Sequence, residues 1–224
     1  MTMKMIQSEW IKIRKSYPSY LIFGFTLLEI ITVLPYLIVV KGQTALEAAT
    51  YFPMLVLTVI VSLVSVLIYE QEEQANHFQM LRREKSLLKL WTSKIIILDV
   101  VLLLPTFFLW CLLSFIFHQP SFLSIGLVYW LLSILLVHFH LLLTLFLGNS
   151  GNLIVAFIEC LLIIFATNKV FLGMYWIPVA IPVNMILMPL HGYCINLVSL
   201  LIWIVLLYTS QIYLLKYAKN NVLK

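Results

Sequence analysis

Charged residues are scarce in this sequence of 224 residues, because Asp, Glu, Lys and Arg together make up only 10% of it. Soluble domains carry about 25% charged residues, whereas here hydrophobic residues reach 63% and the mean hydropathy is +1.06. A chain of this length cannot bury so much apolar surface in a water-soluble fold. Intrinsic disorder is excluded too, because disordered chains are poor in apolar residues. The composition therefore predicts an integral membrane protein.

Several kinds of chemical site also lack their sequence signals. The three cysteines, Cys111, Cys160 and Cys194, lie in or beside apolar runs without paired spacing, which argues against a disulfide framework or a zinc site. The P-loop pattern G-x-x-x-x-G-K-[ST] does not occur, and neither do H-E-x-x-H and G-x-S-x-G. We therefore expect a chain that is not an enzyme and that binds no metal or cofactor of its own.

Six windows are apolar and long enough for a membrane-spanning helix, which needs about 20 such residues. We predict an all-α integral membrane protein whose spans cover residues 20–40, 51–69, 95–117, 125–147, 153–171 and 195–213. The sequence Gly-Asn-Ser-Gly-Asn at 148–152 is typical of a tight turn between the fourth and fifth spans. The segment 172–194 is apolar but interrupted by three prolines, so we expect short helices that re-enter the outer leaflet.

The cations indicate an orientation for these spans. Twelve of the 14 Lys and Arg residues fall within residues 1–19, residues 70–94 and the tail after the last span. The positive-inside rule places these parts, and with them both termini, in the cytoplasm. We expect the net charge of +5 to reflect this topology and contact with anionic lipid, and no binding of nucleic acid.

Residues 1–18 have an amphipathic pattern, with Ile6, Trp10, Ile13 and Tyr17 at helical spacing. This pattern predicts a helix in the cytoplasmic headgroup layer. The alternative is a basic flank that only anchors the first span.

The connection at 70–94 is the most charge-dense part of the chain. From Glu70 to Lys85 the acidic residues precede the basic ones, which suits the helix macrodipole and predicts a helix. Phe78 and Leu81 form an apolar pair surrounded by charge, as expected of a helix that docks on a soluble partner. A solvated loop that only enforces topology is the alternative. A second amphipathic piece, residues 87–94, places Trp91 at the membrane interface.

Three acidic residues fall inside the predicted spans, where each needs a partner, a proton or water. Asp99 lies close enough to the headgroups to pair with Lys94 or with a lysine of the amphipathic helix. Glu29 and Glu159 have no cation nearby in the sequence and are therefore candidates for a substrate path. His138 and His140 lie on nearly opposite helix faces, so we expect hydrogen bonds between helices rather than a shared metal.

Aromatic residues near the outer ends of the spans, Trp110, Trp130, Tyr175 and Trp176, predict an interfacial belt. Tyr175 and Trp176 are also candidates for receiving an amphipathic peptide bound to the membrane. We keep them as substrate-path candidates beside the two buried glutamates.

This arrangement resembles the ABC-2 type permeases: six spans with cytoplasmic ends, an amphipathic helix before the first, and a charged helical connection after the second. The stretches EEQANHFQML at 72–81 and LKLWTSK at 88–94 are similar to the corresponding loop of permease subunits in lantibiotic-immunity and peptide-export transporters. The broken segment at 172–194 is similar to the outer-leaflet helices of that family.

The resemblance implies one ABC-2 type transmembrane domain over residues 1–224, in the bacterial cytoplasmic membrane. It implies a second permease half, identical or homologous, and a cytoplasmic ABC ATPase, expected as a dimer, that binds ATP and Mg²⁺. The residues implied to couple the permease to that ATPase are Glu70, Glu73, Phe78, Leu81 and Arg82.

The activity that this resemblance implies is expulsion of amphipathic antimicrobial peptides, lantibiotic-like or bacteriocin-like, from the membrane, which gives immunity or resistance. Export of endogenous toxic peptides or lipid-associated substrates is an alternative within transport. A membrane scaffold or sensor subunit that transports nothing is an alternative of a different class.

Overall fold

The computed structural model describes residues 3–40, 42–74, 87–167, 174, 176–187 and 193–221. Within these ranges the elements are helical and no strand is present. In chain order they are α1 (Met3–Arg14), α2 (Tyr17–Val39), α3 (Gln43–Gln74), α5 (Leu87–Leu102), the π-helix η1 (Leu104–Phe108), α6 (Leu109–Phe117), α7 (Ser121–Ala166), the 3₁₀-helix η2 (Pro178–Ala180), α8 (Ile181–Leu187) and α9 (Tyr193–Asn221).

Five helical stretches of the described chain are long and apolar enough to cross a membrane: residues 17–39, 44–74, 89–117, 121–166 and 194–215. The chain is therefore all-α, with the helices of a multi-pass membrane protein. The second stretch exceeds the predicted span at both ends. Its last turn, from Glu70 to Gln74, continues α3 and is not the start of a separate helix.

The helix α7 doubles back on itself at Gly148, where φ is 72° and ψ is −176°. Nε2 of His140 lies 2.9 Å from Oε2 of Glu159, 19 residues later, whereas a straight helix would separate them by about 28 Å. The two antiparallel arms, 121–147 and 149–166, correspond to the fourth and fifth predicted spans. The predicted turn at 148–152 is shorter than expected, because residues 149–152 are already helical.

A single proline interrupts the regular α-helix of the third predicted span without ending the helical segment. Pro105 has no N–H to donate to the carbonyl one turn earlier, so the regular helix cannot continue through it. The chain widens instead into the π-helix η1, in which the N–H of Phe108 donates to the carbonyl of Leu103 at 2.9 Å. The segment 87–117 is thus continuous as α5, η1 and α6, and residues 87–94 belong to α5 rather than to a separate piece.

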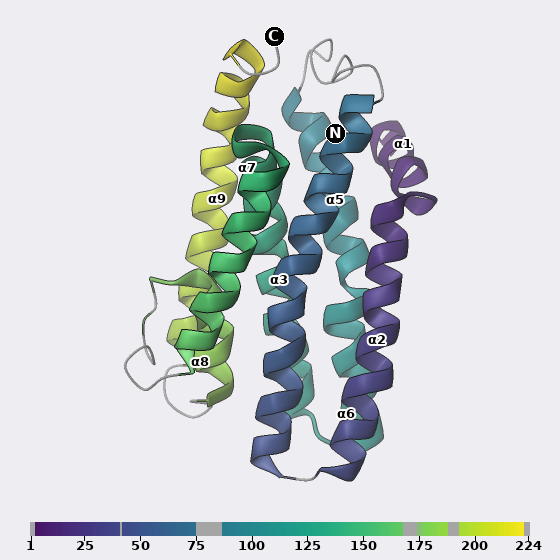
Figure 1. Ribbon diagram of the computed structural model, residues 1–224, viewed down its shortest axis with the longest axis vertical. Coiled ribbons are helices and arrows are strands. Elements are labelled where there is room, and N and C mark those ends of the chain that lie inside the picture. Colours follow the sequence, from purple (N-terminus) through teal and green to yellow (C-terminus); the bar gives the residue numbers. More distant parts are fainter. Residues whose placement is uncertain are drawn as a thin grey trace.

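The helices form an elongated bundle in which both ends of the chain lie at the same end of the molecule (Figure 1). The last turn of α3 and the first turn of α5 also lie there. The turn of α7 lies beside them, because Asn149, next to Gly148, bonds Glu70 in the last turn of α3. We call this the terminal end. At the opposite end α2 leads into α3 and α6 leads into α7. In the proline-broken segment, η2 and α8 pack against α3, α7 and α9, so short helical pieces are present as predicted.

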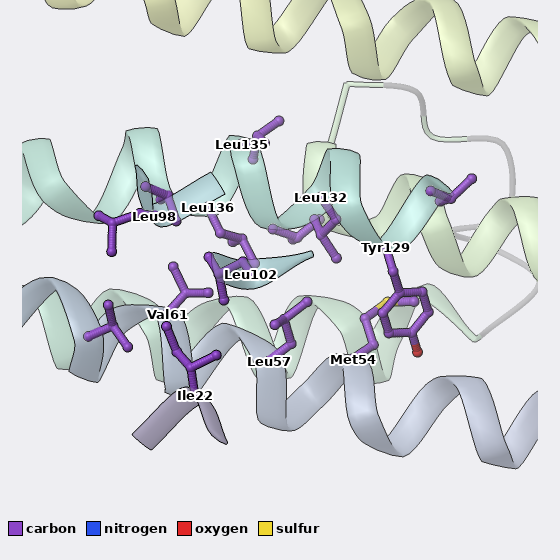
Figure 2. Close-up of a cluster of buried hydrophobic side chains, with 14 of the residues drawn as sticks. Ile22, Met54, Leu57, Val61, Leu98, Leu102, Tyr129, Leu132, Leu135 and Leu136 are labelled. Carbon is purple, nitrogen blue, oxygen red and sulfur yellow. The ribbon is translucent and has the colours of Figure 1, made fainter. Parts of the chain in front are cut away.

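The core lies between α2, α3, α5 and the first arm of α7 (Figure 2). Met54 and Leu57 of α3 face Leu132 and Tyr129 of α7, and all four are almost completely buried. This packing excludes water from the middle of the bundle, so every polar group inside it needs a protein partner.

This packing corrects one aromatic prediction. Trp110, expected in the outer belt, is fully buried, and its ring packs at 5.7 Å from that of Tyr129. Trp91 is 7% exposed, so its ring is surrounded by protein. In the amphipathic N-terminal segment Ile13 is buried, whereas Trp10 and Tyr17 are exposed.

Candidate functional site

The terminal end contains an ion cluster that joins three helices. It consists of Glu9 of α1, Lys12 of α1, Glu72 of α3 and Lys94 of α5, and we call it the terminal ion network. Nζ of Lys12 lies 2.7 Å from Oε1 of Glu9 and 3.3 Å from Oε1 of Glu72. Nζ of Lys94 bonds Oε1 of Glu72 and lies 3.9 Å from Oε2 of Glu9.

Most of the terminal ion network is buried, so losing one of its members costs more stability than losing a member of a surface pair would. Glu9, Glu72 and Lys94 are all buried, and two acids balance two bases. Removing one member of a buried ion pair typically costs about 3–5 kcal/mol, because the other charge is left uncompensated. Burial by itself lowers the pKa of Lys12, but the hydrogen bond with Glu9 and the charges of Glu72 and Glu9 outweigh it, so this pKa is raised above 10.5.

The predicted coupling residues are only partly described. Oε1 of Glu70 accepts a hydrogen bond from Nδ2 of Asn149 at 2.9 Å, which ties the end of α3 to the turn of α7. Glu73 is exposed. Phe78, Leu81 and Arg82 lie outside the described residues. Glu72 was not among the predicted coupling residues, although it is the acid that bonds both lysines of the network.

A second polar cluster lies inside the bundle, between the arms of α7 and α3. His140 bonds Oδ1 of Asn152 through Nδ1 at 2.6 Å and Oε2 of Glu159 through Nε2 at 2.9 Å. Nδ2 of Asn152 donates to the carbonyl of Ser62 at 3.1 Å. The hydrogen bonds between helices expected of His140 are therefore present, and Glu159 has a partner that its sequence neighbours did not indicate.

The hydrogen bonds of this cluster determine where its protons lie. The Ser62 carbonyl can only accept, so the amide nitrogen of Asn152 must face it and the amide oxygen must face His140. Nδ1 of His140 therefore carries a proton. The remaining contact, from Nε2 to Glu159, holds one proton shared between imidazole and carboxyl, so the pair is neutral overall. This neutrality allows both groups to remain buried.

Glu29 has a different environment. It lies near the middle of α2, is 1% exposed, and neither carboxyl oxygen has a hydrogen-bond partner among the described residues. It lines a cavity of about 400 Å³ between α2 and α3, whose other walls are almost entirely apolar and include Phe25, Tyr36 and Phe52. Both carboxyl oxygens are covered by protein, so Glu29 borders this cavity without exposing its carboxyl group to it.

Asp99 does not form the ion pair with Lys94 that the sequence suggested, because Lys94 is engaged by Glu72 and Glu9. Trp130 instead donates from Nε1 to the backbone carbonyl of Asp99 at 3.1 Å. Trp176 is 67% exposed, and Tyr175 lies outside the described residues.

Metal binding finds no support in the described part of the chain, where no group of three or more His, Cys, Asp or Glu side chains is placed to hold an ion. His138, on the face away from His140, bonds the amide of Gln211 in α9 at 2.8 Å.

No family model, curated protein or solved structure matches this chain. A proposal for its function therefore depends on the sequence pattern and on the geometry above.

Proposed function

We propose that this chain is the permease subunit of an ATP-driven ABC exporter in the bacterial cytoplasmic membrane. Its cargo is an amphipathic antimicrobial peptide, lantibiotic-like or bacteriocin-like, that it removes from the membrane. ATP and Mg²⁺ bind to a separate ATPase dimer, and a second permease half completes the particle. The support is the sequence resemblance of residues 70–94 together with the helical, apolar architecture.

The proposal includes six crossings with both termini in the cytoplasm. Two observations support it. The arms of α7 are antiparallel about Gly148, so the 46 residues of that helix make two passes along the bundle. The terminal end also contains α1 and the start of α5. Twelve of the 14 Lys and Arg residues belong to the segments assigned to the cytoplasm.

The observation that carries the coupling proposal is the position of the terminal ion network. Its members Glu72 and Lys94 lie in the helices that lead into and out of the connection 75–86, and they bind one another and α1. A force applied to this connection by an ATPase would move the ends of α3 and α5 together with α1 as one body. Such rigid-body movement is a common mechanism of switching between two conformations.

Co-purification from the native membrane tests this proposal. The tagged chain is expected to retain an ATPase, and Phe78→Asp or Leu81→Asp is expected to release it, because an apolar docking contact would acquire a charge. Gln79→Asp is the matched control, since it adds the same charge to a polar position of the same segment. Resistance to added peptide should fall with Phe78→Asp and persist with Gln79→Asp.

The alternatives predict other outcomes. Secretion of endogenous peptide without any change in resistance would favour export of the cell's own products. ATP hydrolysis that no peptide stimulates in the reconstituted complex would favour a scaffold or sensor subunit. Absence of any ATPase from the purified particle would contradict the proposal itself.

A further inference from the structure

We propose that the cavity between the start of α2 and the end of α3 binds a phospholipid whose headgroup carries both a phosphate and a primary ammonium group, as phosphatidylethanolamine does. An acyl chain of this lipid lies in the groove that continues between the same two helices. The inference rests on the proposed function only for the leaflet, because a cytoplasmic terminal end assigns the lipid to the inner leaflet. Binding itself requires neither the ATPase nor a peptide.

The first step in the argument is the depth of the cavity in the membrane. It has a volume of about 700 Å³ and lies where α1 and the start of α2 meet the last turns of α3. Its lining includes the apolar Leu67 and, one turn and two turns later in α3, the polar Glu70 and Gln74. Tyr17 and Tyr20 of α2 also line it and are 79% and 65% exposed, and tyrosine is enriched where a protein crosses the membrane surface. The cavity therefore lies at the level of the lipid headgroups.

The second step is the charge that the cavity presents to a ligand. Lys12 lines the cavity, but the acids of the terminal ion network already compensate its charge. Lys15 lines it as well, and no acid of the described chain forms an ion pair with it. Glu70 accepts a hydrogen bond from the neutral amide of Asn149 and pairs with no described cation, so its negative charge is not balanced. One cation and one acid are thus available to a ligand.

The third step is the match between these two charges and a zwitterionic headgroup. A phosphate group can pair with Lys15 while an ammonium group donates hydrogen bonds to Glu70, and both contacts are charge-assisted. A free phosphate, or a headgroup with negative charge only, would be repelled by the Glu70 carboxylate, and a simple amine would be repelled by Lys15. The amides of Gln71 and Gln74 add neutral donors and acceptors to the lining. The cavity therefore favours a ligand that carries both charges.

The fourth step is the groove that can hold the acyl chain. Gln74 at this cavity and Val56 at the apolar cavity of about 400 Å³ are about five whole turns apart in α3, so they lie on the same face of that helix. Tyr17 and Leu28 of α2 line the same two cavities and are about three turns apart. Gly24 lies between them, is exposed and has nothing within 4 Å of an added Cβ, so the groove is open there. The length from Tyr17 to Leu28, about 16 Å, is close to half of the ~30 Å hydrocarbon core, which is the depth of one leaflet.

Equilibrium binding of phosphatidylethanolamine with tritiated acyl chains to the whole tagged chain in detergent tests the site. Unlabelled phosphatidylglycerol, which has the phosphate but no ammonium group, should compete at least about fivefold less well than unlabelled phosphatidylethanolamine. Glu70→Gln should weaken binding of phosphatidylethanolamine and strengthen that of phosphatidylglycerol, because the acid that attracts one and repels the other is gone. Lys15→Gln should weaken both lipids, because both carry the phosphate.

Matched controls separate the cavity from the general surface charge. Arg14→Gln and Glu73→Gln make the same changes of charge at exposed neighbours that do not line the cavity, and both should bind the two lipids like the wild type. Gly24→Leu should weaken both lipids equally, because it fills the groove without changing charge. Excess inorganic phosphate should leave the labelled lipid bound, because it supplies neither the ammonium group nor the acyl chain.

Four results would each overturn the inference. These are equal affinity of the wild type for the two lipids, an unchanged preference in Glu70→Gln, equal effects of Lys15→Gln and Arg14→Gln, and displacement of the lipid by inorganic phosphate. None of them bears on export, which is refuted by absence of an ATPase from the purified particle. That absence would in turn leave the preference for phosphatidylethanolamine intact.

Discussion

His140 and Glu159, 19 residues apart in sequence, share a proton across a 2.9 Å contact between the two arms of α7. The contact holds together the two arms of a helical hairpin, which are also connected by the turn at Gly148. Both side chains are buried, so water cannot take the place of either partner if the contact is broken.

Replacing His140 with Ala should destabilise the protein by about 3–5 kcal/mol, since it leaves the Glu159 carboxyl buried without its partner. Glu159→Gln should cost less, about 1 kcal/mol, because the amide can still hydrogen-bond the imidazole. Thermal unfolding in detergent, followed by circular dichroism, measures both. Glu73→Ala, at an exposed glutamate of α3, is the control and should leave the midpoint unchanged.

Gly148→Ala should destabilise the chain by about 1–3 kcal/mol, because φ of 72° with ψ of −176° is a conformation that essentially only glycine adopts. Gly24→Ala provides a control of opposite sign. Gly24 lies within α2 and has nothing within 4 Å of an added Cβ, so alanine there should be neutral or stabilising by up to about 1 kcal/mol. Equal effects of the two substitutions on the unfolding midpoint would contradict the strained turn.

Lys94→Ala should destabilise the terminal end by about 3–5 kcal/mol, because Glu9 and Glu72 lose the buried cation that lies between them. The exposed Lys89, one and a half turns earlier in α5, is the matched control and should change stability by less than about 0.5 kcal/mol. The double variant Glu72→Gln with Lys94→Ala should lose less stability than the two single variants together, because no Glu72 charge is then left without Lys94. Unfolding in detergent measures all of these variants, and strictly additive losses would argue against a direct pair.

The stability contributed by Lys12 should depend on pH only in the alkaline range. Its pKa is raised above 10.5 in the folded chain, so its favourable contribution is complete below pH 10.5 and is lost as the pH rises through the folded value. The difference in unfolding midpoint between the wild type and Lys12→Gln should therefore be constant from pH 7 to 10 and shrink above that. A difference that already falls between pH 7 and 9 would contradict this assignment.

The sequence predicted the helical class and the approximate position of every long helix, because long apolar runs have few alternatives to a helix in a membrane. It also located the reversal near Gly148, since a Gly-Asn-Ser-Gly-Asn stretch interrupts an otherwise continuous apolar pattern. The predicted turn was too long, because the helix resumes directly after Gly148. Asn152, which bonds His140, is already part of that helix.

The partners of the charged residues were decided by the tertiary structure alone. Glu72 and Lys94 are separated by 22 residues, and Glu9 and Lys12 reach them from a helix that precedes both. Hydropathy and periodicity describe how a helix faces its surroundings, but which charges meet depends on the rotation and depth of each helix in the bundle. For the same reason the acids at 29 and 159 looked equivalent in sequence, although packing placed one beside an imidazole and the other at the wall of an apolar cavity.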